Sequence, residues 1–382
     1  MNRRGFLGAA AAASILPVPA RAASAGAKVS VARCGSYGPE LTPALERMFD
    51  QLGGMGSLVK GKTVAMKVNL TGVPTVRLGY VPAELAHWTH PAVIGATAHL
   101  LAKAGARHIR VVESAWSTAD PLEEVMLEAG WDPQPMLTAA PRVEFENTNW
   151  LGKARKYSRF QVPKGGHIYT AFDLNHSYED CDVFVSIAKM KEHATAGITL
   201  AMKNLFGIAP AAIYGDGAGK DEPSPVPRGG RNMFHQGHRQ PSGSAPPEKD
   251  PKTPREGGYR VPRIVADLVA ARPIHLSIVE AIETMTHGEG PWIPGGSRHV
   301  RPGVLVAGLN PVSTDAVCMA LMGFDAMDDR GKAPFERCDN TLRLGEELGA
   351  GTRDMRRIEV LGTPIRELRF DFRRATASSP SG

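Results

Sequence analysis

CDVFVSIAKMKEHATAGITLAMKNLFG, residues 181–207, begins with the pattern of a strand and ends with that of a helix. Residues 181–189 are mostly apolar and rich in β-branched side chains, which predicts a buried strand. Residues 195–207 carry apolar side chains at helical spacing behind Thr195, a residue type that caps helices. A strand followed by a helix is the repeating unit of α/β proteins.

The same alternation extends in both directions from this stretch. β-branched apolar runs predict strands, and apolar residues at helical spacing, with Pro near the start or Gly near the end, predict helices. This order is typical of the α/β class, with a largely parallel sheet covered by helices on both faces. The predicted strands are 62–70, 108–114, 181–189, 274–283 and 303–310, and the predicted helices are 90–106, 121–130, 195–207, 311–323 and 340–351.

Residues 214–263 interrupt this alternation, because they are dense in Gly and Pro and contain few periodic apolar residues. A loop of this length inside a compact domain is usually functional or disordered. Its Pro, Gly and charge content favours disorder, whereas Tyr214, Met233, Phe234 and Tyr259 favour packing. We expect a long ordered Gly/Pro-rich loop that lies over the cleft at the strand ends.

The N-terminus has the features of a twin-arginine export signal, namely Arg3 and Arg4, an alanine-rich apolar run and a small-x-small cleavage site. A membrane anchor is the alternative, but the run is short and two prolines interrupt its end. No later segment has eighteen uninterrupted apolar residues, so we expect no membrane span in the mature chain. The expected organisation is a leader at 1–22, a single α/β domain at 23–375 and a disordered tail at 376–382. The twin-arginine machinery would deliver it to the periplasm or the medium.

The composition argues against several classes of protein. The leader holds three of the arginines behind the formal net charge of +6, so the mature chain is weakly basic and shows no nucleic-acid footprint. Its four cysteines form no C-x-x-C pair, which argues against an iron–sulfur cluster or a zinc ribbon and leaves disulfides open. No strand leads into a phosphate loop or a G-x-G-x-x-G turn, so neither an NTP nor an NAD site is indicated. The cofactor stays unknown.

Polar side chains follow each predicted strand. Ligands of open α/β sheets bind beyond the carboxyl ends of the strands, so we expect these side chains to share one cleft. Any one of them taken alone could equally be an ordinary surface residue. The candidates for binding a cofactor or ligand are Lys67, Asn69, Glu113, Asn204 and Asn310, and polar neighbours include Ser114, Lys189, Glu283 and Ser313.

Five ionisable residues are the catalytic candidates, because lysines bind carboxylates or phosphates and a nearby carboxylate can move a proton. We expect the anion to contact Lys191, His193 and Lys203. Glu280 and Asp315, with Glu283 as an alternative, are the candidates for an acid/base or a metal ligand. Lys203 could instead be a solvated lysine on an amphipathic helix. If it neutralises Glu280 and Asp315, Lys203→Met should destabilise the protein.

Four histidines are candidates for binding a transition metal, because imidazole is the commonest protein ligand for such ions. Each alone is more often a surface or core residue than a ligand. His287 lies in a glycine-flanked turn, from which a side chain can reach back over a cleft. The four candidates are His193, His235, His238 and His287.

Five segments carry a resemblance to a known family: KVNLTG, THPAVIGA, DVFVSIAKMKEHATAGITLAMKNLFG, LSIVEAIETMTHGEGP and VLVAGLNPVSTDAVCMALMG. Over about 60–365, the chain resembles the domain-of-unknown-function 362 family, in its secreted twin-arginine branch. The K-x-K-x-H…K-N-L-F-G block is the most specific part. Some relatives carry an added ferredoxin-like cluster module, but this chain lacks the cysteines for one. The resemblance sharpens the location of the site rather than the reaction.

Two functions are compatible with these residues. The first is an exported enzyme, redox-active or dependent on a metal or cofactor, that acts on a small anionic molecule in the cleft. The second is a non-catalytic periplasmic protein that binds a cofactor or ligand or serves as a redox partner. A third possibility for the same residues is a buried charge network that serves only the fold.

Overall fold

The computed structural model describes residues 27–116 and 118–377. The predicted leader, 1–22, lies outside this range. Two residues of the predicted disordered tail, 376 and 377, instead belong to helix α13 (Phe372–Ala377), and the remainder of that tail lies outside the described residues.

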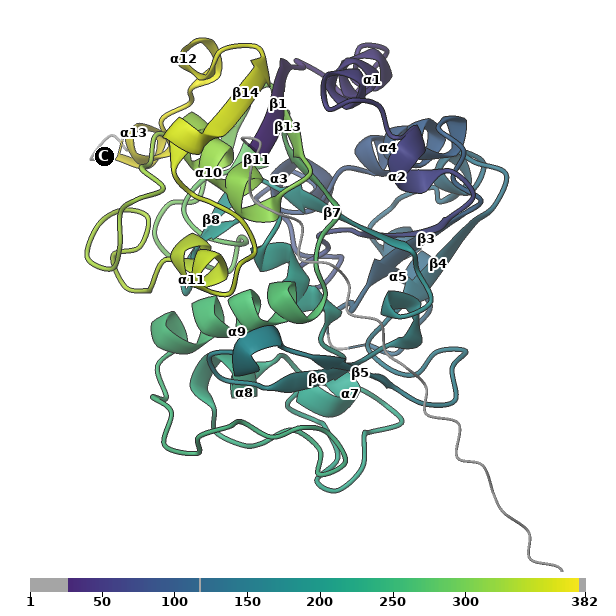
Figure 1. Ribbon diagram of the computed structural model, residues 1–382, viewed down its shortest axis with the longest axis vertical. Helices are drawn as coiled ribbons and strands as arrows, with labels where there is room; N and C mark the ends of the chain where they lie inside the picture. The colour runs from purple at the N-terminus through teal and green to yellow at the C-terminus, as the bar shows by residue number, and fades with distance from the viewer. Residues whose placement is uncertain (1–26, 117, 378–382) are drawn as a thin grey trace, which may run out of the picture.

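A central eight-stranded sheet confirms the α/β class (Figure 1). The strands lie in the order β14-β1-β13-β10-β7-β2-β3-β4. The five predicted strands correspond to β2, β3, β7, β10 and β13, whereas β1, β4 and β14 were not predicted. The bounds are β1 (Ala27–Arg33), β2 (Thr63–Lys67), β3 (His108–Glu113), β4 (Val143–Asn147), β7 (Val183–Lys189), β10 (Leu276–Ala281), β13 (Val304–Gly308) and β14 (Ile358–Gly362).

Strand β13 runs against both of its neighbours, β1 and β10, while the other pairings in this sheet are parallel. The sheet is therefore largely parallel, as predicted, with one reversed strand. Because β13 is reversed, its carboxyl end lies on the side of the sheet where β2, β3, β7 and β10 begin, away from their carboxyl ends. The expectation that all five strand ends share one edge was wrong for β13.

Helices pack on both faces of the sheet, and the strands alternate between two apolar clusters. Along β7, Val185 and Ile187 face the cluster that contains α1 and α4, while Phe184 and Ala188 face the cluster that contains α9 and α10. Such two-sided burial is typical of a mostly parallel sheet. The main helices are α1 (Leu41–Gln51), α4 (Pro91–Lys103), α5 (Leu122–Glu128), α9 (Gly257–Ala271), α10 (Pro311–Met322) and α11 (Thr341–Glu347).

The order of the strands changes direction between β2 and β7. From β2 the chain continues outward through β3 and β4, and from β7 it continues to the other side through β10. The connections therefore diverge at this point and leave a crevice beyond the carboxyl ends of β2 and β7. Ligands of open α/β sheets bind at such switch points.

The helix predicted over 195–207 is absent, and a hairpin followed by a 3-10 turn takes its place. Strands β8 (Lys191–His193) and β9 (Gly197–Thr199) pair antiparallel, and η3 (Lys203–Ile208) follows. Gly197 has φ +74, and an added Cβ would lie 2.6 Å from the ring of Phe335. A backbone conformation that disfavours other residues therefore ends the helical pattern at Gly197.

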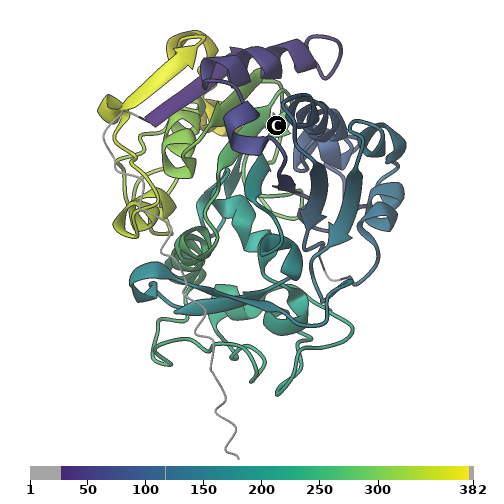
Figure 2. The same cartoon turned by 45° about the vertical axis from the view of Figure 1, so that its right-hand side comes forward.

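Residues 214–263 are not a loop throughout. They contain α8 (Asn232–Gln236), and their last seven residues form the start of α9. Helix α9 packs on α8, and a small antiparallel sheet of β5 (Ser158–Gln161) and β6 (Ala171–Leu174) lies beside them at the lower end of both views (Figures 1 and 2). Met233 and Phe234 are buried in this layer, so the packing expected of the apolar residues in this segment is present.

Short elements complete the described chain, and none of its helices is long and apolar enough to cross a membrane. The short elements are α2 (Gly56–Val59), α3 (Ala83–Ala86), α6 (Gln134–Leu137), α7 (Ala211–Tyr214), α12 (Ile365–Leu368), β11 (Thr284–Met285), β12 (His299–Val300), η1 (Pro163–Gly165), η2 (His176–Tyr178) and η4 (Met355–Arg357).

Candidate functional site

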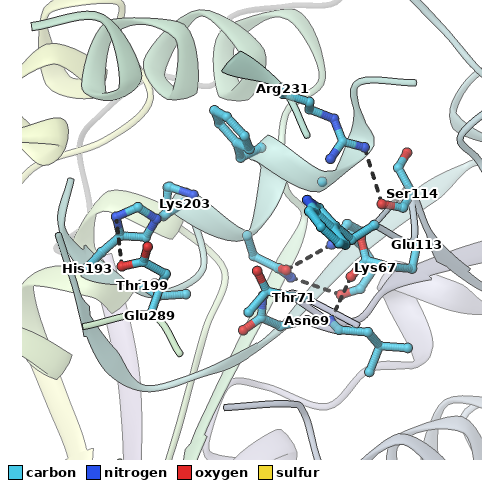
Figure 3. A pocket seen from close by; sticks show the side chains of 16 residues that line it. Lys67, Asn69, Thr71, Glu113, Ser114, His193, Thr199, Lys203, Arg231 and Glu289 are labelled. Atoms are coloured by element: carbon cyan, nitrogen blue, oxygen red, sulfur yellow. Dashed lines mark hydrogen bonds and ion pairs between the residues drawn. The ribbon is translucent and has the colours of Figure 1, made fainter. Parts of the chain in front are cut away.

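A pocket of about 60 Å³ opens at the crevice between β2 and β7 (Figure 3). Four parts of the chain line it: the end of β2, the end of β3, the hairpin and 3-10 turn after β7, and the loops that hold Arg231 and Glu289. The charged and polar lining residues are Lys67, Asn69, Thr71, Glu113, Ser114, His193, Thr199, Lys203, Asn204, Arg231 and Glu289.

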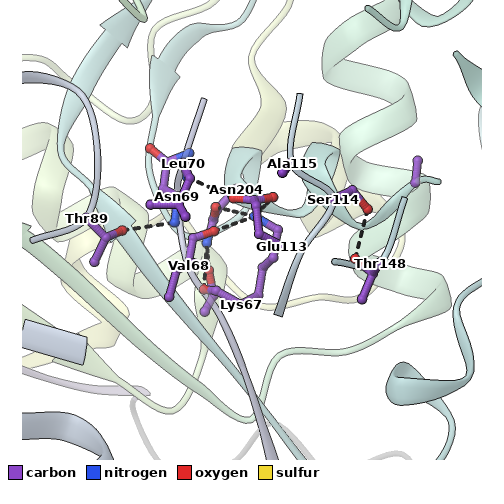
Figure 4. A network of polar contacts seen from close by, with 12 residues as sticks. Lys67, Val68, Asn69, Leu70, Thr89, Glu113, Ser114, Ala115, Thr148 and Asn204 are labelled. Atoms are coloured by element: carbon purple, nitrogen blue, oxygen red, sulfur yellow. Dashed lines mark hydrogen bonds and ion pairs between the residues drawn. The ribbon is translucent and has the colours of Figure 1, made fainter. Parts of the chain in front are cut away.

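A buried ion pair forms the floor of this pocket (Figure 4). The Nζ atom of Lys67 lies 2.8 Å from Oε1 of Glu113 and 2.9 Å from Oδ1 of Asn204. Glu113 also accepts a hydrogen bond from the amide of Leu70, and the Asn204 amide donates to the hydroxyl of Ser186. Burial lowers the pKa of Lys67 and raises the pKa of Glu113, and their mutual attraction opposes both shifts. Predicted binding residues from β2, β3 and η3 therefore do meet here.

Gly207 allows this ion pair to approach the backbone. A Cβ atom at this position would lie 2.5 Å from Oε1 of Glu113 and 2.9 Å from Nζ of Lys67. Both distances are shorter than van der Waals contact, so a larger residue would displace the pair. The final glycine of the K-N-L-F-G block therefore has a steric role beside the charges.

Lys191 lies one layer behind the pocket rather than in its lining. Its buried Nζ donates one hydrogen bond of 2.7 Å to Oδ1 of Asn69 and one of 2.6 Å to the carbonyl of His87. Burial, with repulsion from nearby Lys189 and Lys203, places its pKa well below the usual value. Lys191 thus orients Asn69, which does line the pocket.

Lys203 occupies the pocket without a charged or hydrogen-bonded partner in the described part of the chain. Its Nζ lies over the Phe206 ring, 4.2 Å from the centroid. Burial lowers its pKa to about 7; attraction from Glu289 opposes this effect, and repulsion from Lys67 adds to it. The side chain is half-buried, so its charge is only partly hydrated.

The proposed neutralisation of Glu280 and Asp315 by Lys203 is wrong. Glu280 pairs with Lys189. Asp315 accepts two hydrogen bonds of 2.9 Å, from the backbone amides of Ala201 and Met202. The helical face expected for Lys203 is also absent, because the residue stands at the start of η3.

Arg231 was not predicted from the sequence, because it lies in the Gly/Pro-rich segment and no local pattern marks it. Its guanidinium donates to the carbonyls of Ala209 and Ser114 and to Oδ1 of Asn149. All three acceptors are uncharged, so its positive charge has no ion-pair partner among the described residues. Burial lowers the pKa of Arg231 to about 10, which leaves it charged at neutral pH.

His193, Thr199 and Glu289 lie together on the Lys203 side of the pocket (Figure 3). Glu289 accepts a hydrogen bond from the amide of Ala194 and lies 3.7 Å from Nδ1 of His193. Burial and neighbouring Lys203 hold the pKa of His193 well below its usual value, so the ring is neutral at pH 7. The buried hydroxyl of Thr199 has no partner among the described residues. The pocket thus offers an unused hydroxyl beside an unpaired ammonium.

The Glu280 carboxylate belongs to a second charged cluster on the other face of the sheet. Lys67 and Ser186 are register partners and share a face, whereas Lys189, three residues beyond Ser186, faces the other way. Lys189 and Glu280 pair at 2.5 Å, and Glu280 also accepts from the hydroxyl of Tyr37, over 3.0 Å. Both members of the pair are fully buried. The structure therefore does not bring Glu280 into the pocket.

Asn310 and Asp315 also lie outside the pocket lining. Asn310 caps α10 by accepting a hydrogen bond from the amide of Ser313. It follows the reversed strand β13, so it lies on the side of the sheet away from the pocket. Asp315 holds the turn that leads into η3, and burial raises its pKa to about 7. Its contacts position the backbone immediately before Lys203.

Of the four candidate metal ligands, His193 alone lines the pocket. His235 packs edge-on against Phe206, His238 lies 3.7 Å from Asp216, and His287 contacts the carbonyl of Pro294. Within residues 27–116 and 118–377, no group of three or more His, Cys, Asp or Glu side chains is arranged to hold a metal ion. All four cysteines are buried free thiols.

Comparisons with known proteins identify a family for this chain. The chain is 29% identical over 198 residues to Thylakoid-associated protein sll1697 of Synechocystis sp., a match that covers 50% of this chain and 55% of that protein. The chain thus matches about half the length of that relative. A crystal structure of a Thermotoga maritima protein is similar at a TM-score of 0.33 and 14% identity, covering 65% of this chain and 51% of the other. The sequence model of the family named domain of unknown function 362 (DUF362) matches residues 64–320, and the chain therefore belongs to the DUF362 family.

Proposed function

We propose that this protein is an exported enzyme that binds a small anionic molecule in the Lys67–Arg231 pocket and uses Lys203 to transfer a proton. The observation that carries the proposal is the Lys203 ammonium, which lies in the pocket with no anionic partner in contact among the described residues. Three cations and two carboxylates line the pocket. A bound anion would supply the missing counter-charge.

The lysines and the arginine of this pocket have different roles, because they differ in their partners. Lys67 is already neutralised by Glu113, so it supports the floor. Lys203 and Arg231 have no carboxylate in contact among the described residues, so their charges are available to a ligand. The unpartnered Thr199 hydroxyl supplies a further hydrogen bond. An anion held between these groups would raise the pKa of Lys203, because an opposite charge favours the protonated amine.

A lysine with a pKa near 7 is suited to acid–base chemistry, because both of its protonation states are populated at neutral pH. An uncharged Lys203 amine can accept a proton from a substrate that Arg231 holds, and the ammonium can return it. This possible use of Lys203 is our reason for proposing the enzyme before the binding protein.

Calorimetric titration of the purified protein with phosphate, sulfate and a panel of small organic acids tests the binding step. We expect an anion to bind the wild type and to lose at least tenfold in affinity in Lys203→Met, because one charge-assisted contact is removed. Lys103→Met is the control, since Lys103 is exposed at the end of α4 and pairs with Glu46 on the surface. Equal affinity of the two variants for every anion would contradict the proposal.

Exchange of carbon-bound protons in D₂O, followed by ¹H NMR, separates the enzyme from the binding protein. An organic acid that binds should exchange a proton with the wild type and not with Lys203→Met. Binding without exchange or any other turnover would assign the second function, a non-catalytic ligand-binding protein of the periplasm.

The export part of the proposal is supported by the Arg3–Arg4 leader sequence alone. Replacing both arginines with lysine should retain the protein in the cytoplasm of its host, because twin-arginine signals require the pair. Fractionation of cells that express the two forms measures this directly. Unchanged export of the double variant would refute the assignment.

A further inference from the structure

Two partly exposed tryptophans stand at the mouth of the pocket. Trp116 lines the pocket directly and is 44% exposed, and Trp292 is 41% exposed. Exposure of large apolar side chains to water is unfavourable, so a ligand that covers them gains binding free energy. Tryptophan is also enriched where proteins bind partners or ligands, because its wide ring gives a large contact area.

Glycines hold both indole rings close to the pocket. A Cβ at Gly230 would lie 3.3 Å from Nε1 of Trp116, so this indole lies against the residue that precedes Arg231. A Cβ at Gly72, another lining residue, would lie 2.5 Å from the ring of Trp292. One indole therefore lies against the backbone that precedes Arg231, and the other lies against the lining segment after β2.

The small volume of the pocket limits what can enter it. Its volume of about 60 Å³ is small for an organic molecule, and charged side chains line it. The anionic group of a ligand therefore fits its inner part, and an attached organic part extends toward the mouth. There it meets Trp116, because Trp116 both lines the pocket and remains exposed.

We infer that the pocket takes an organic anion with a planar ring, whose carboxylate or phosphate enters between Lys203 and Arg231 while the ring stacks on Trp116. The inference rests on the proposed anion site and names its substrate class. Stacking between flat π-systems is favourable and tolerant of ring identity. The ring size and substituents are therefore less restricted than the anionic group.

Matched pairs of ligands test this inference by calorimetry. Phenyl phosphate is compared with methyl phosphate, and benzoate with acetate, so that each pair shares its anionic group and differs in the ring. We expect the aromatic member of the pair that binds to bind the wild type about tenfold more tightly than its partner. Trp116→Ser should remove this preference, because the ring that the aromatic ligand stacks on is gone.

Two further variants exclude an effect through the fold. Trp116→Phe keeps a ring and should retain most of the preference, whereas Leu127→Ser, at an exposed apolar residue of α5 outside the pocket lining, should retain all of it. Equal affinities within each pair, or a preference that survives Trp116→Ser, would overturn the ring inference and leave the anion site standing. If none of the four ligands binds the wild type, the inference fails together with the proposed anion site.

Discussion

Replacing Lys203 with methionine should stabilise the ligand-free protein. Lys203 lies in the pocket without a partner among the described residues, and burial lowers its pKa from 10.5 to about 7. A folded state that lowers the pKa of a lysine disfavours its charged form. Methionine keeps most of the apolar stem and the contact with the Phe206 ring and removes the charge.

The size of this effect follows from the shift in pKa. The change from 10.5 to about 7 corresponds to about 5 kcal/mol at roughly 1.4 kcal/mol per pKa unit. Lys203 keeps part of its exposure, so water screens the charge and we expect about 1–3 kcal/mol. Below pH 7 Lys203 is protonated in both states, and the variant should exceed the wild type by this full amount. Between pH 7 and 10.5 the unfolded wild type holds the proton that the folded state has lost, so wild-type stability rises with pH and the difference disappears.

Urea denaturation of wild type, Lys203→Met and Lys103→Met at pH 6, 8 and 10 measures this prediction. The free energy of unfolding of Lys203→Met should exceed that of the wild type most at pH 6 and least at pH 10. Lys103→Met should show no such gain, because Lys103 is exposed and paired with Glu46. A Lys203→Met variant that is less stable than wild type at pH 6 would refute the reasoning and indicate a buried anionic partner for Lys203.

Three further substitutions probe the surroundings of the pocket. Glu113→Gln leaves the buried Lys67 ammonium without its counter-ion and should lower the free energy of unfolding by about 3 kcal/mol in urea titrations; an unchanged midpoint would mean that Asn204 alone supports Lys67. Gly207→Ala places a methyl group 2.5 Å from the Glu113 carboxylate and should cost about 1–3 kcal/mol as well as anion affinity, whereas wild-type values would show that the floor can shift freely. Asp315→Asn can no longer accept from both the Ala201 and Met202 amides and should cost about 1–3 kcal/mol in thermal or urea unfolding. Its anion affinity should fall by less than that of Lys203→Met, because Asp315 positions the backbone before Lys203 without lining the pocket. Abolished binding without loss of stability would place Asp315 in the site itself.

Much of the sheet could be predicted from the sequence because its central strands are buried on both faces. Runs such as 181–189 are mostly apolar, and a short run of this kind is typical of a strand that is covered on both sides. The direction of β13 has no comparable signal, because a strand buried on both faces reads the same in either orientation. Helix α9 was missed because Pro262 and two glycines at its start resemble loop residues, although Val261, Ile264 and Val265 have helical spacing.

The candidate site could be predicted where it depends on the ends of parallel strands and on the segment that follows β7, which supplies Lys203 and Asn204. Lys67, Asn69 and Glu113 were found because the carboxyl ends of β2 and β3 meet at one edge. Glu280 was wrongly placed in the pocket, because successive residues of a strand point to opposite faces of the sheet. Glu280 lies at the carboxyl end of β10, but its side chain is on the face away from the pocket. Arg231 and Glu289 reach the pocket through tertiary packing of irregular segments, which no local pattern encodes.

The most direct test of the anion site is the pKa of Lys203 itself. NMR titration of protein with labelled lysine side chains, with Lys203→Met to assign the resonance, gives this value with and without saturating phosphate or an organic acid that binds. The account predicts a pKa of about 7 in the free protein and an increase of about one unit or more when the anion binds, because the ligand supplies the missing counter-charge. An ordinary lysine pKa near 10.5 that no anion changes would contradict it.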